Sequence, residues 1–209
     1  MKSSFKFFSL WLLLALGAAT LVFNSCGHAL LSQGVVINGV KWATSNVDAA
    51  GTFAAKPEDP GMFYQWNRKT AWPITNEVSD WDSSIPTGDT WEKANDPCPA
   101  GWRMPTLDEI KTLLDIVKVE SEWITQNGVN GRKFTDKATG NSIFLPAAGG
   151  RWNGNDDGVR VVGLDGYYWT GTKYDSNSSC YLNFAINGYI GWDYRSNLGN
   201  GYSVRAVAK

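Results

Sequence analysis

The sequence predicts one α+β domain with paired strands at its two ends, one main amphipathic helix and long ordered loops. Three observations carry this prediction. Strand-like segments stand near both ends, the clearest helical period begins at Thr106, and residues 46–95 are rich in Gly, Pro, Asp and Trp. A chain of 209 residues that is 43% hydrophobic can bury one globular core, which excludes a disordered or collagen-like chain.

The first 25 residues have the pattern of an export signal. Lys2 and Lys6 precede an apolar run from Leu10 to Phe23. This run is shorter than the roughly 20 residues that a membrane-spanning helix needs. We therefore expect residues 1–25 to be removed as a signal peptide.

The end of this signal resembles a bacterial lipobox. Ser25 directly precedes Cys26, although Phe23 stands where Leu is usual. The resemblance implies that Cys26 is lipidated, that residues 26–34 form a tether, and that the protein is anchored to the outer membrane, on either of its faces. A plain signal peptide followed by an incidental cysteine is the alternative.

The mature chain opens with a predicted hairpin. Residues 35–37 and 40–44 flank Asn38-Gly39, a pair that supplies the positive φ angles of a type I′ turn. Residues 46–95 follow without a long period. We expect them to form an ordered loop, because six of their side chains are too apolar to be left in water: Phe63, Tyr64, Trp66, Trp72, Trp81 and Trp91.

The main helix is predicted to begin at Thr106 and to end between Val117 and Glu120. Thr106 and Glu109 have the spacing of a capping box, in which each side chain bonds the other residue's backbone N–H. One face of the expected helix is apolar and should meet the core: Leu107, Ile110, Leu113, Leu114 and Val117.

Strands are predicted over most of the remainder, because β-branched and aromatic residues recur between turn signals. Leu182, Phe184 and Ile186 should point inward from their strand. In the last strand, Tyr202, Val204 and Ala206 should face away from Ser203, Arg205 and Val207. The expected strands cover residues 132–135, 142–145, 167–172, 180–186, 189–194 and 202–207, with turns at Thr139-Gly140-Asn141 and Asn187-Gly188.

Charge and residue usage exclude several functions. The net charge of −1 gives no basic footprint, so no nucleic-acid partner is expected. His28 is the one histidine, which excludes a His-rich metal site and a triad that needs an internal histidine. We expect no metal, no cofactor and no catalytic residue. Export permits a disulfide between Cys98 and Cys180, but the sequence leaves their pairing open.

Residues 173–201 carry the clearest functional signal. They include 5 Asn, 4 Tyr, 4 Ser and 4 Gly, the rigid aromatic and small polar types that antibody paratopes favour. This composition predicts a binding face for a glycan or a surface protein, and an ordinary polar loop region is the alternative. The predicted contacts are Tyr174, Asn177, Asn187, Tyr189, Trp192, Asp193, Tyr194 and Arg195.

Six motifs, in order along the mature chain, resemble the FISUMP ("major paralogous") domain of bacterial surface and secreted proteins. That family looks related to the C-type-lectin-like fold, including its variant in formylglycine-generating enzymes. The motifs are Val40-Lys41-Trp42-Ala43-Thr44, Gly61-Met62-Phe63-Tyr64-Gln65-Trp66, Asp96-Pro97-Cys98-Pro99-Ala100-Gly101-Trp102-Arg103-Met104-Pro105-Thr106, Phe144-Leu145-Pro146-Ala147-Ala148-Gly149, Gly166-Tyr167-Tyr168-Trp169-Thr170 and Tyr202-Ser203-Val204-Arg205.

The resemblance implies a C-type-lectin-like domain over residues 35–209 in a lipid-anchored envelope protein that recognises a ligand without catalysis. Many relatives carry Cys where Ala206 stands here, so Cys98 either pairs with Cys180 or both remain thiols. Some lectin-fold proteins are diversified by retroelements at codons that favour Asn, Tyr, Ser and Asp, and this origin stays open for residues 173–201.

Three further functions stay open at this point. The two cysteines could serve an enzyme of the formylglycine-generating type. The protein could instead be a structural envelope or pilus-associated component. The segment from Trp152 to Asp157 holds oxygen ligands that suit calcium, although a solvated polar loop explains it as well.

Arg103 and Arg205 are expected to brace carboxylates or carbonyls, and Trp102, Tyr168 and Trp169 to fill the core.

Overall fold

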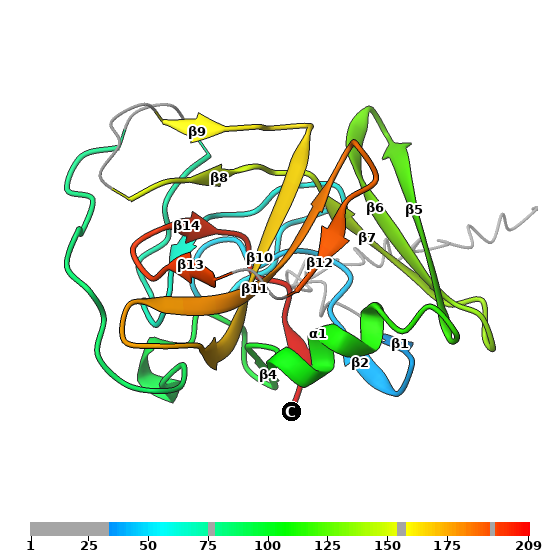
Figure 1. The fold of residues 1–209 in the computed structure, drawn as a ribbon, viewed down its shortest axis with the longest axis horizontal. Coiled ribbons are helices and arrows are strands. Elements are labelled where there is room, and N and C mark those ends of the chain that lie inside the picture. The colour runs from blue at the N-terminus through cyan, green and yellow to red at the C-terminus, as the bar shows by residue number, and fades with distance from the viewer. Residues whose placement is uncertain (1–33, 75–77, 154–157, 193–194) are drawn as a thin grey trace, which may run out of the picture.

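The computed structural model describes residues 34–74, 78–153, 158–192 and 195–209. These residues form a mostly-β domain built from several antiparallel sheets and one short α-helix (Figure 1). The α+β class predicted from the sequence therefore overestimates the helical part. Among the described residues, no helix has the length and apolarity needed to cross a membrane.

The first sheet joins the two ends of the described chain, as the sequence predicts. Asn38 and Gly39 adopt φ angles of 44° and 83°, which form the expected turn between its first two strands. The last strand lies between strands from the start and the middle of the chain. The order is β1 (Val35–Ile37), β2 (Val40–Trp42), β15 (Val207–Ala208) and β4 (Trp102–Arg103).

The second sheet is a three-stranded meander, one strand of which the sequence did not predict. Its turns are Asn127-Gly128 and residues 137–140, and the second overlaps the turn expected at Thr139-Gly140-Asn141, where Asn141 already bonds Asp136. Asn127 and Gly128 both have positive φ, at 48° and 84°, so this pair was an overlooked hairpin signal. The strands are β5 (Val119–Gln126), β6 (Val129–Asp136) and β7 (Ser142–Pro146).

The third sheet is organised around one central strand that pairs with three others. Both of the short strands that follow it return to it, one near each of its ends. The strand predicted over 167–172 falls within one long member, and the strand predicted over 180–186 extends one residue beyond the other. They are β10 (Asp165–Lys173), β11 (Ser178–Ala185), β12 (Ile190–Gly191) and β13 (Arg195–Asn197), with β11 at the centre.

The fourth sheet consists of two-residue strands that tie the long loop to the body of the domain. A separate 3₁₀ turn, η1 (Lys93–Asn95), ends this loop region. The strands, in order across the sheet, are β3 (Tyr64–Gln65), β14 (Gly201–Tyr202), β8 (Gly150–Arg151) and β9 (Val159–Arg160).

The helix α1 (Leu107–Leu113) is shorter than the sequence predicts. Its start is as expected, because Thr106 and Glu109 form a complete capping box. Its end comes early. The carboxylate of Asp115 accepts the backbone N–H of Val117 at 3.1 Å, and this local turn competes with further helix. Val117 is consequently 80% exposed and not on a buried face.

The prediction of one regular last strand over 202–207 is also wrong. Residues 203–206 run through the centre of the molecule and bond backbone groups of several segments, including Tyr167, Val47 and Ala43. Side chains on both faces are therefore buried, and Arg205 is as inaccessible as its apolar neighbours. Ile186 is 52% exposed and not inward-facing, because β11 ends one residue earlier and a turn begins there.

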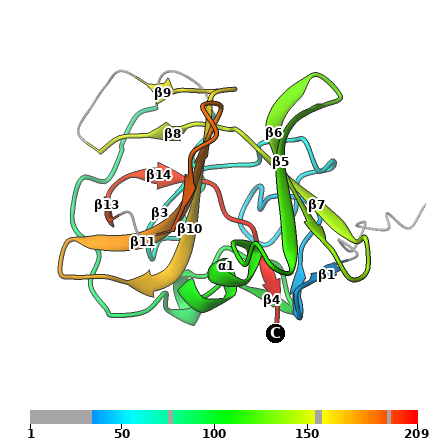
Figure 2. The same cartoon turned by 45° about the vertical axis from the view of Figure 1, so that its right-hand side comes forward.

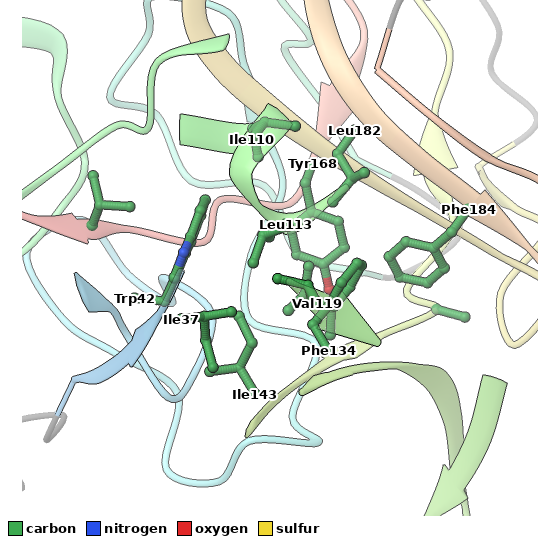
Figure 3. Packing of buried hydrophobic residues seen from close by; sticks show 13 residues of the cluster. Ile37, Trp42, Ile110, Leu113, Val119, Phe134, Ile143, Tyr168, Leu182 and Phe184 are labelled. Atoms are coloured by element: carbon green, nitrogen blue, oxygen red, sulfur yellow. The ribbon is translucent and has the colours of Figure 1, made fainter. Parts of the chain in front are cut away.

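The predicted core aromatics and the ordered loop are confirmed. Trp102, Tyr168 and Trp169 are buried, and Phe63, Tyr64 and Trp66 in the long loop are fully inaccessible. The indole N–H of Trp66 donates to the carbonyl of Thr170 at 3.1 Å, so the loop is fastened to β10. Figure 3 shows the main core cluster, where α1 and β5 contribute Leu113 and Val119 side by side.

Candidate functional site

A groove of about 550 Å³ lies where the end of α1 meets the start of β5 and the hairpin of β12. Its volume lies in the range of small-ligand sites, and most of its lining is apolar. Figure 1 shows α1 below β12 with β5 to the right, and Figure 2 shows β5 rising beside α1. The lining residues are Leu113, Leu114, Ile116, Val119, Ser121, Tyr189, Ile190, Gly191 and Trp192.

Two of the predicted contacts, Tyr189 and Trp192, lie in this groove. Trp192 is half-buried and packs against the main core cluster. The ammonium group of Lys111 lies 4.6 Å from the centre of the Trp192 ring, within cation–π range. Lys111 also pairs with Asp108 at 3.0 Å. Lys111 of α1 thus contacts the Trp192 ring, and Trp192 also forms part of the groove lining.

Asn187 lies beside the groove at the tip of the β11–β12 hairpin. Its side-chain oxygen accepts the backbone N–H of Tyr189 at 3.0 Å, and Gly188 has a φ of 90°. The Gly188 N–H donates to the carbonyl of Ala185 at 3.1 Å, which closes the turn. The expected turn is therefore present, and the Asn187 side chain orients Tyr189 from an exposed position.

Three other predicted contacts form a second group at the opposite end of β11. The guanidinium of Arg195 lies 3.8 Å from the ring centre of Tyr174 and also donates a hydrogen bond to the Tyr174 hydroxyl. Asn177 is exposed, and its backbone N–H donates to the Asp175 carboxylate at 2.9 Å. Hydrogen bonds from Ser178 and Asn177 hold the pKa of Asp175 below its ordinary value.

The structure does not bring the predicted contacts into one site. Arg195 pairs with Cys180, whereas Ile190 pairs with Phe184 four residues further along β11. At roughly 3.4 Å per residue, the two groups are about 14 Å apart along the strand. Asp193 and Tyr194, which follow Trp192, lie outside the described residues, as does the lipidation residue Cys26.

The sequence did not indicate the apolar wall of the groove. Leu113 and Leu114 were assigned to a helix face that meets the core, and Ile116 was not singled out. The early end of α1 exposes Ile116 to 81% and places it at the rim of the groove. The available signal was Asp115, a residue that favours local turns, ahead of two consecutive β-branched residues.

The cysteines do not form the disulfide that was left open. No bond joins Cys98 to Cys180 in the structure. Burial and the nearby Asp96 carboxylate raise the pKa of the Cys98 thiol well above its ordinary value. Because the thiolate is the reactive form of cysteine, this environment disfavours the thiolate at Cys98.

The two arginines of the family-like motifs brace the scaffold, as expected. Arg103 makes a forked bond to Glu109, at 2.8 and 2.6 Å. Arg205 donates to the side-chain oxygen of Asn46 at 2.9 Å and to the carbonyls of Ala43 and Phe144 at 3.1 and 2.9 Å. Burial lowers the pKa of Arg205 to about 10.

The calcium hypothesis falls largely outside the described part of the chain. Asn155, Asp156 and Asp157 are not described, whereas the side-chain oxygen of Asn153 accepts the indole N–H of Trp81 at 3.2 Å. Within the described residues, no group of three or more His, Cys, Asp and Glu side chains could hold a metal ion.

Comparison with known proteins adds no relative to this picture. No protein-family model matches the chain, and no curated protein or solved structure matches it.

Proposed function

We propose that this protein is a recognition protein of the bacterial envelope, whose domain binds a surface ligand in the groove between α1, β5 and β12. The observation that carries the proposal is the meeting of Tyr189 and Trp192 with an apolar wall around about 550 Å³. Half-buried aromatic side chains on a rigid base supply contact area at a low cost in conformational entropy.

The family-like motifs support a C-type-lectin-like FISUMP domain over residues 35–209. The paired terminal strands and the long loop fastened by Trp66 agree with that assignment. The lipobox-like segment supports anchoring through Cys26, with residues 26–34 as a tether. Inhibition of lipoprotein signal processing should then leave a longer precursor in the producing cell, and an unchanged size would contradict the anchor.

The ligand-binding proposal is tested with an array of glycans and cell-surface proteins. Wild-type protein is compared with Trp192→Ala in the groove and with Tyr174→Ala at the opposite end of β11. We expect at least one array ligand to bind wild type and Tyr174→Ala alike and to lose most of its binding to Trp192→Ala. Equal binding by all three proteins would show that the ligand binds outside the groove.

A further inference from the structure

Both side walls of the groove are strands that end a sheet. β5 is the terminal strand of the β5–β6–β7 sheet, and β12 is terminal on the path from β10 through β11. Over the described ranges, no other strand or isolated bridge pairs with the outer edge of either strand. An unpaired strand edge is a template for another extended chain, because its N–H and C=O groups need partners.

The register of β5 shows which of its backbone groups face outward. In an antiparallel pair, hydrogen-bonded and non-hydrogen-bonded residue pairs alternate. The carbonyl of Asn130 accepts the N–H of Ala147 and therefore points away from β5, so Thr125 and Asn130 form a non-hydrogen-bonded pair. By alternation, the N–H and C=O groups of Ser121, Trp123 and Thr125 point away from β6, toward the open edge.

The two faces of this edge differ in chemistry. On the inner face, Val119 and Ser121 line the groove, and Leu114 and Trp192 lie across from them. On the outer face, Glu120 and Glu122 are both exposed, and Glu122 has one partner in Lys133 at 3.2 Å. A strand added to β5 would therefore direct alternate side chains into an apolar groove and toward two carboxylates.

We propose that the groove binds an extended peptide segment that alternates apolar and basic side chains and adds to β5 as a fourth strand of its sheet. The inference rests on the proposed function, because it assigns a ligand class to the same groove. Main-chain bonds to Ser121 and Trp123 give affinity. The apolar wall and the two glutamates give the alternating preference.

The test measures binding of labelled heptapeptides to the purified protein by fluorescence anisotropy. The probe alternates Val and Lys, and three comparison peptides alter one property each. One replaces every Lys by Glu, one places the same residues in two blocks, and one is N-methylated on alternate amides along one edge. We expect the alternating Val–Lys peptide to bind at least tenfold more tightly than each comparison peptide.

Two variants with matched controls locate the site. Ile116→Gln changes a side chain at the groove rim that is 81% exposed, and Ile85→Gln changes one that is 51% exposed in the long loop. Glu120→Lys reverses a charge on the outer face of β5, and Asp89→Lys reverses one on a fully exposed side chain elsewhere. We expect a loss of roughly three- to tenfold for each groove-side variant and none for its control.

Three outcomes would overturn the proposal. The N-methylated peptide could bind as tightly as its parent, Ile116→Gln could bind like Ile85→Gln, or the Val–Lys peptide could fail to bind. If the array ligands still bind through Trp192 while the peptides do not, the strand addition is wrong and the proposed function stands. If the array ligands do not depend on Trp192 and the peptides do not depend on Ile116, both proposals are wrong.

Discussion

The two ends of β11 carry opposite kinds of surface. At the β12 end, Trp192 packs against the main core cluster and lines, together with Tyr189, the groove at the end of α1. At the β13 end, Tyr174 and Arg195 contact each other above an exposed turn. Both groups come from one polar, aromatic stretch of sequence. The comparison shows that composition marks candidate contacts, whereas the elements packed beneath them decide which contacts form a cavity.

The largest expected effect comes from removing the support of the β12 end. Phe184 is fully buried and lies against Phe134, Trp123 and Tyr168. Phe184→Ala should lower the free energy of unfolding by about 3–5 kcal/mol, because it deletes a packed ring. Urea denaturation measures this loss. Ser178→Ala near the β13 end is the control, and a similar loss there would remove the contrast between the ends.

The next effect concerns the helix that forms the base of the groove. Thr106→Ala removes the hydroxyl that accepts the N–H of Glu109 at 3.2 Å, and should cost about 1 kcal/mol of stability. Thr106→Ser keeps the acceptor and should restore most of it, as measured by thermal and urea unfolding. If Thr106→Ser loses as much stability as Thr106→Ala, the methyl group of Thr106 and not its capping hydroxyl stabilises the helix.

The same helix start gives the protein an acid-sensitive contact. Burial raises the pKa of Glu109, but hydrogen bonds from Arg103 and Thr106 outweigh it and hold the pKa below the ordinary 4.5. A lowered pKa in the folded protein means that ionised Glu109 stabilises the fold fully at pH values above its ordinary pKa. This stabilisation is lost as the pH falls through the pKa that Glu109 has in the folded protein. Urea midpoints between pH 6 and pH 3 should therefore fall more steeply for wild type than for Glu109→Gln. Parallel curves would contradict the assignment.

The smallest effect is expected at the β13 end. The Tyr174–Arg195 contact is exposed, so its loss should cost at most about 1 kcal/mol. A double-mutant cycle with Tyr174→Ala and Arg195→Ala measures the coupling between the two side chains. A coupling well above that value would show that this end is as firmly organised as the groove.

Local signals predicted most of the scaffold. The turn at Asn38-Gly39 and the capping box at Thr106 each depend on a few adjacent residues, and both were predicted correctly. The errors arose where tertiary contacts overrode local pattern. Residues 203–206 lack a strand period because the middle of the domain buries both of their faces.

The candidate site was predicted only in part, for the same reason. Tyr189 and Trp192 were recognisable as residue types that bind ligands. The groove itself depends on Leu114, Ile116 and Ser121, which come from a segment some 70 residues earlier. No pattern within one segment specifies that β5 and β12 face each other across the end of α1.

The position of β15 between β2 and β4 also constrains how the protein is made. Val207 pairs with both Trp42 and Arg103, so no strand joins β2 to β4 in the first sheet until residues 207–208 have been synthesised. Arg205 bonds residues 43, 46 and 144, and it is synthesised only two residues before Val207. The domain therefore cannot complete its fold progressively from the N-terminus, and a nascent chain would keep this sheet open until residues 205–207 are available.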